Sequence, residues 1–145
     1  MADLHIDDFY RDVALIMLYL YSSFPRKTIL YVEDVCGPDN PDEYGLHTER
    51  YRGCFSAMVW LAEQGYIQFY ETVREEALDQ AVLSQRGFLL LSTRSELKLG
   101  IPEEEAALPP SVMEHSMTNI MQIRTALKSR SSIMMRQVMH YLLSQ

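Results

Sequence analysis

The sequence predicts a mostly helical α+β fold with an appended C-terminal helical segment. Three observations support this prediction. The chain has 145 residues, 48% of them hydrophobic, which is enough to bury a core. Apolar residues recur at three- and four-residue spacing over several segments, which indicates amphipathic helices. One stretch after Gly65 is rich in β-branched and aromatic residues, which predicts a β-hairpin. We expect a domain over residues 1–94, a connector over 95–110 and the helical segment over 111–145.

The first expected helix begins at Asp7 or Asp8, whose carboxylates can cap it. It ends before Phe24-Pro25, because the residue before a proline resists helical geometry. The helix is apolar almost all round, so we expect it to be central. No apolar run approaches the roughly 20 residues that a membrane-spanning helix needs, and the acidic N-terminus is unlike a signal peptide. We therefore expect a cytoplasmic protein.

Short elements follow this helix. Residues 27–30 read as an extended piece and 31–36 as one or two helical turns, while the Pro, Asp and Gly residues of 37–45 predict an exposed loop. Thr48 resembles an N-cap, and the next helix runs to Gly65. On a helical wheel its core side collects Tyr51, Phe55, Met58 and Ala62, and its opposite side collects Glu49, Gly53, Ser56 and Trp60.

The predicted hairpin has strands at 66–73 and 78–83, joined by a polar turn at Arg74 to Glu76. Ser84 then caps a short helix over 85–92. From Ser111 to Leu143 the chain is helical by propensity and period, with a candidate break near 129–132.

Two segments resemble a winged helix-turn-helix domain of bacterial transcription regulators. Leu61-Ala62-Glu63-Gln64-Gly65-Tyr66-Ile67 looks like the end of a recognition helix running into the first wing strand. Leu83-Ser84-Gln85-Arg86-Gly87-Phe88 looks like the strand-to-helix junction after the wing. The resemblance covers residues 7–92. The long loop 37–47 and the acidic N-terminal half depart from the family's pattern.

The resemblance implies binding to duplex DNA through the helix that precedes the wing. Such a helix presents hydrogen-bond donors to bases and phosphates, and a wing tip reaches a phosphate or the minor groove. The residues expected to face DNA are Thr48, Arg50, Arg52, Ser56 and Arg74. This basic footprint is smaller than nucleic-acid binders usually have.

Trp60 lies on the side of its helix away from the expected core. Three interpretations stay open: the C-terminal segment covers it, a partner protein packs on it, or nucleic acid contacts it. The C-terminal helix carries six of the nine methionines and an imperfect heptad pattern. The apolar, methionine-rich residues of this pattern are either ordinary core or an interface. As an interface they would bind a second copy or a different protein. The residues expected at this interface are Trp60, Met113, Met117, Ile120, Leu127, Met134, Val138 and Tyr141.

Charge is unevenly placed along the chain. Residues 1–50 hold ten acids and four bases, whereas four bases and no acid follow Glu114. The basic C-terminal residues could guide self-association with the acidic N-terminal half or attract an anionic partner. The alternative is that they form a solvated helix face. Two cysteines, Cys36 and Cys54, are too few for a disulfide framework, and we interpret both as small core residues.

The residue patterns give little support for catalysis. The four histidines are scattered, and Cys36, His47 and Cys54 match no familiar zinc spacing. There is no phosphate-binding glycine loop and no nucleophile elbow. We expect no enzymatic activity, no metal and no cofactor. Two functions remain: a homodimeric winged-helix DNA-binding protein that regulates transcription, which we favour, or a winged-helix protein-interaction module of a larger assembly.

Overall fold

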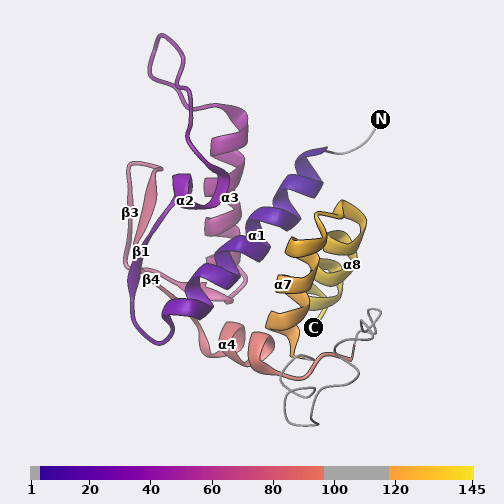
Figure 1. The fold of residues 1–145 in the computed structure, drawn as a ribbon. Coiled ribbons are helices and arrows are strands. Elements are labelled where there is room, and N and C mark those ends of the chain that lie inside the picture. The colour runs from indigo at the N-terminus through magenta and orange to yellow at the C-terminus, as the bar shows by residue number, and fades with distance from the viewer. Residues whose placement is uncertain (1–3, 97–117) are drawn as a thin grey trace. The chain divides into compact units, whose positions relative to one another are not determined.

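The computed structural model describes residues 4–96 and 118–145 and confirms a mostly helical α+β fold with a small antiparallel sheet (Figure 1). The chain divides into two compact units, Met1–Phe88 and Leu89–Gln145. The first unit contains the sheet and the helices around it. Among the described helices, none has the length and apolar composition needed to cross a lipid bilayer.

Helix α1 (Leu4–Ser23) places its apolar residues in the core of the first unit. Its end before Phe24-Pro25 is confirmed. The predicted cap at Asp7 or Asp8 is wrong, because the helix is already formed at Leu4 and both acids lie inside it. Their carboxylates still favour this end of the helix, since the exposed backbone N–H groups carry partial positive charge. The buried residues of α1 are Asp12, Val13, Ala14, Ile16, Met17 and Leu20.

The short elements after α1 agree with their predictions. Strand β1 (Thr28–Tyr31) leads directly into α2 (Val32–Cys36). Gly37 ends α2 with a φ of 90°, a backbone conformation that favours glycine. The predicted loop follows, and most of its side chains are exposed.

Helix α3 (Glu49–Glu63) begins at the predicted N-cap, where the Thr48 side chain accepts a hydrogen bond from the Tyr51 backbone N–H. The predicted core side is wrong in part, because Phe55 and Ala62 are only half-buried. The buried face is rotated toward α1 and α2, on which α3 packs. The buried residues of α3 are Tyr51, Cys54, Ala57, Met58 and Leu61.

The sheet has β4 (Ala77–Leu83) at its centre, with β1 on one side and β2 (Ile67–Gln68) and β3 (Glu71–Val73) on the other. All three pairings are antiparallel. The predicted first strand of the hairpin is therefore two short strands. The predicted turn is confirmed: Arg74 and Glu75 both have positive φ, and the Glu76 N–H donates to the Val73 carbonyl, which is the geometry of a type I′ hairpin turn.

Helix α4 (Gln85–Ser92) begins at Ser84, whose hydroxyl accepts from the Gly87 N–H at 3.0 Å and donates to the Gly65 carbonyl. The Ser84 N–H donates to the Tyr66 carbonyl at 3.0 Å. The turn that ends α3 and the turn that starts α4 are thus joined directly. These hydrogen bonds bring together the two segments 61–67 and 83–88.

In the second unit, α7 (Asn119–Ser129) and α8 (Ser132–Leu143) pack on each other. The candidate break near 129–132 is confirmed, because Arg130 adopts the left-handed conformation and Ser131 caps α8. The imperfect heptad pattern is therefore divided between two helices. The part of the prediction on residues 97–117 lies outside the described residues.

Candidate functional site

The N-terminal end of α3 brings together charged and polar side chains from α1, the loop and the hairpin turn. Thr48 is fixed there by two interactions besides its capping bond. Its hydroxyl donates to Asp39 Oδ1 at 2.8 Å, and its backbone N–H donates to the same oxygen at 3.3 Å. The loop is thereby tied to the first turn of α3.

His47 extends this cluster to the hairpin turn. Its Nδ1 lies 2.6 Å from Asp39 Oδ2, its ring stacks on Tyr51 with 4.1 Å between centroids, and its Nε2 lies 3.9 Å from Glu76 Oε1. Since a carboxylate only accepts hydrogen bonds, Nδ1 carries the proton toward Asp39. Three segments of the chain therefore meet at one imidazole.

These contacts act on the acid–base groups around them. Burial opposes ionisation of Asp39, but the hydrogen bonds from Thr48 and His47 outweigh it and hold the pKa of this carboxyl below its usual value. Burial, together with the nearby Glu76 and Glu33 carboxylates, raises the pKa of Tyr51 to about 12. At neutral pH the cluster thus holds an ionised Asp39 and a neutral Tyr51.

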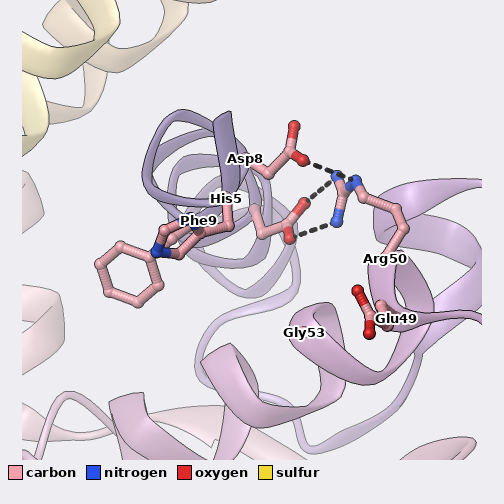
Figure 2. Close-up of a pocket in the computed structure, with 7 residues that line it drawn as sticks. His5, Asp8, Phe9, Glu49, Arg50 and Gly53 are labelled. Atoms are coloured by element: carbon pink, nitrogen blue, oxygen red, sulfur yellow. Dashed lines mark hydrogen bonds and ion pairs between the residues drawn. The ribbon is translucent and has the colours of Figure 1, made fainter. Parts of the chain in front are cut away.

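A cavity of about 220 Å³ lies between the N-terminal halves of α1 and α3. Figure 2 shows Asp8 of α1 turned toward Arg50 of α3. The lining residues are His5, Asp8, Phe9, Asp12, Glu49, Arg50 and Gly53.

Arg50 is bound by the carboxylates of α1. Its two terminal nitrogens each lie 2.6 Å from an oxygen of Asp12, and its Nε lies 3.6 Å from Asp8. The Asp12 side chain is 2% exposed and that of Arg50 is 35% exposed. Burial raises the pKa of Asp12 against the opposing effect of Arg50, while the hydrogen bonds to Asp12 raise the pKa of Arg50. The pair therefore links α1 to α3 as a bidentate ion pair.

The structure separates the residues expected to face DNA into two groups. Thr48 and Arg50 use their polar atoms inside the protein, as described above. Arg52 and Ser56 are exposed one helical turn apart on α3, and Arg74 is exposed in the turn between β3 and β4.

Trp60 packs edge to face on Phe9 of α1, with 5.2 Å between ring centroids, and is half-buried. Trp60 therefore contacts α1, an arrangement that the three interpretations did not include.

The predicted interface residues of the second unit differ in burial. Ile120 and Val138 are buried, whereas Leu127, Met134 and Tyr141 are half-buried. Met113 and Met117 lie outside the described residues.

The two cysteines are free thiols, and burial raises the pKa of each. Cys54 is fully buried, as expected, but Cys36 is only partly buried. Within residues 4–96 and 118–145 there is no group of three His, Cys, Asp or Glu side chains placed to hold a metal ion.

Sequence reasoning missed the partners of Arg50 and the roles of Asp39 and His47. For Arg50 a signal was present, because Asp12 is an acid within an otherwise apolar helix and a buried carboxylate requires a partner. For Asp39 and His47 there was none, since their contact depends on how the loop folds. No family model, curated protein or solved structure matches this chain.

Proposed function

We propose that the first unit is a winged helix-turn-helix domain. The observation that carries this proposal is the order of the sheet: β4 lies between β1 and the β2–β3 segment, while α1, α2 and α3 precede the hairpin. In a winged helix, α3 is the recognition helix and the turn between β3 and β4 is the wing tip. The joined ends of α3 and α4 support the same arrangement.

We further propose that the protein binds duplex DNA as a homodimer and regulates transcription. The surface proposed to bind DNA consists of Arg52, Ser56 and Arg74, all exposed. Guanidinium groups bind phosphates and guanine edges, and a hydroxyl bonds to either kind of acceptor. Gly53, exposed beside Arg52, leaves room for a close approach to the groove. The proposed surface does not include Thr48 and Arg50, because their hydrogen-bond donors are bound to Asp39 and Asp12.

The test compares two double variants in titrations of a labelled mixed-sequence duplex at several salt concentrations. We expect Arg52→Ala/Arg74→Ala to lose affinity at least about tenfold and to lower the salt slope by about 2, since each lost phosphate contact lowers it by about 1. The control, Arg26→Ala/Lys27→Ala, removes the same charge from the turn between α1 and β1. Equal losses in the two variants would refute the assignment of this surface.

A second candidate function is a protein-interaction module that does not bind DNA directly. It is favoured by the charge of residues 4–88, which hold 14 acids and seven bases and would repel a polyanion. It predicts no duplex affinity even at low salt, and loss of a co-purifying protein on Trp60→Ala. Retention of that protein by the variant would exclude Trp60 from the docking surface.

A further inference from the structure

One face of the sheet carries exposed apolar side chains. Tyr31 and Val73 both pair with Ala77 across β4, so the three residues form a row on one face. The neighbouring pair Leu30 and Leu78 is fully buried on the opposite face. The row of Tyr31 therefore lies on the outward face, where Tyr31 is 48% exposed and Val73 41% exposed, while the small Ala77 between them is 1% exposed.

Ile29 extends this apolar row. It precedes Tyr31 by two residues, so it shares the outward face of β1, and it is 40% exposed. Three large apolar side chains thus lie on a surface that water contacts. We call this surface, together with the acids described next, the outer sheet face.

Two carboxylates lie beside the apolar row. Glu71 pairs directly with Asp79 across β3 and β4, two residues from the pair of Val73 and Ala77, and so lies on the same face. Like charges directly opposite in a ladder are unfavourable. Within the described parts of the chain, neither carboxylate forms an ion pair. A ligand that fits this face therefore combines an apolar side chain with cations.

The chain itself contains such a segment. Residues 118–145 hold four bases and no acid. Lys128 and Arg130 are exposed where α7 turns into α8, and Ile133 in the first turn of α8 is 67% exposed. We define Lys128, Arg130 and Ile133 as the helical tip.

We propose that the outer sheet face of one copy binds the helical tip of a second copy. Ile133 would cover the row of Tyr31 and Val73, and the cations of the tip would neutralise Glu71 and Asp79. Each copy carries both surfaces, so the proposal is that the two copies exchange two reciprocal contacts and form a two-fold dimer. This inference rests on the homodimer in the proposed function and is independent of DNA binding.

Charge reversal of each surface tests the proposal. The face variant is Glu71→Lys/Asp79→Lys, and the tip variant is Lys128→Glu/Arg130→Glu. Sedimentation at low and physiological salt gives the mass of each in solution. We expect the wild type to dimerise, each variant alone to associate at least about tenfold more weakly, and an equimolar mixture to dimerise again, because both contacts in the mixed dimer join opposite charges.

The control variant, Glu43→Lys/Glu63→Lys, makes the same charge change as the face variant, but on the exposed loop and at the end of α3, and should dimerise like the wild type. Face and tip variants that stay dimeric would overturn this inference while leaving the homodimer intact, with its interface elsewhere. A monomeric wild type would overturn both. Weakened variants that do not recover on mixing would show that the face and the tip do not bind each other and would also overturn the proposal. DNA titration of the same proteins reports on the DNA surface separately.

Discussion

Gly87 has no space for a side chain, so Gly87→Ala should destabilise the first unit. A Cβ at this position would overlap the Tyr66 carbonyl oxygen and lie 3.1 Å from its carbon and 3.3 Å from Leu83 Cδ2. Since the obstacle is mainly backbone, it cannot move away as a flexible side chain would. The same Tyr66 oxygen accepts the hydrogen bond from the Ser84 N–H, so a shift that admits the methyl group also strains the junction of α3 and α4.

The magnitude follows from three contributions. Overpacking costs about 1–3 kcal/mol, and the severe overlap places this variant at the upper end. Weakening the bond from Ser84 costs about 1 kcal/mol more. Alanine in place of glycine stabilises a helix by about 1 kcal/mol, which offsets part of this cost. We therefore expect Gly87→Ala to lower the free energy of unfolding by about 3 kcal/mol.

Gly53→Ala is the matched control. Gly53 also lies within a helix, but a Cβ there meets nothing within 4 Å, so the substitution should stabilise the protein by about 0.5–1 kcal/mol. Urea unfolding followed by the fluorescence of Trp60, the single tryptophan, reports on the unit that contains both glycines. If the two variants differ by less than about 1 kcal/mol, the backbone obstacle inferred at Gly87 does not exist.

Three further predictions concern ionisable groups. Arg50→Ala should cost about 1–3 kcal/mol near pH 7, where a buried Asp12 carboxylate is left unpaired. Because burial raises the pKa of Asp12, this cost should already become smaller above pH 3.8, as the carboxyl binds a proton, and urea unfolding at neutral and acid pH measures the difference. Because the pKa of Asp39 is lowered, its contribution to stability should be present at neutral pH and be lost as the pH falls below 3.8, and Asp39→Asn should remove this loss from the unfolding curves. A thiol reagent should modify Cys36 before the fully buried Cys54 in the native protein, as mass spectrometry after timed quenching can show; equal rates would contradict the burial of Cys54.

The elements predicted correctly are those whose ends depend on local chemistry. Thr48 and Ser84 cap helices with their own hydroxyls, Pro25 stops α1, and the polar turn between the strands of the hairpin is confirmed. Each of these signals acts over about four residues, so the sequence alone contains it. The start of α1 was predicted too late. An acid in the first turn of a helix, such as Asp7, gives the same sequence signal as an acid at the N-cap.

The helical segment of the second unit shows where periodicity fails. Three- and four-residue spacing continues across Arg130, yet this residue leaves the helix and the chain begins a new one at Ser132. Spacing records which residues share a face but not whether the backbone between them turns. Ile120 and Val138, for which the sequence left core and interface both open, are buried in a unit where α7 packs on α8.

The candidate DNA surface depends on long-range contacts that spacing does not contain. Arg50 was counted as a donor because it stands beside Arg52 at the start of a recognition helix. Its partner Asp12 is 38 residues away, and only the packing of α1 on α3 brings them together. Once Arg50 and Thr48 are engaged internally, Arg52 and Arg74 are the cations left among the five residues expected to face DNA. The proposed DNA binding would then depend on these two side chains more strongly than the sequence suggests, which is why their double substitution tests the proposed surface.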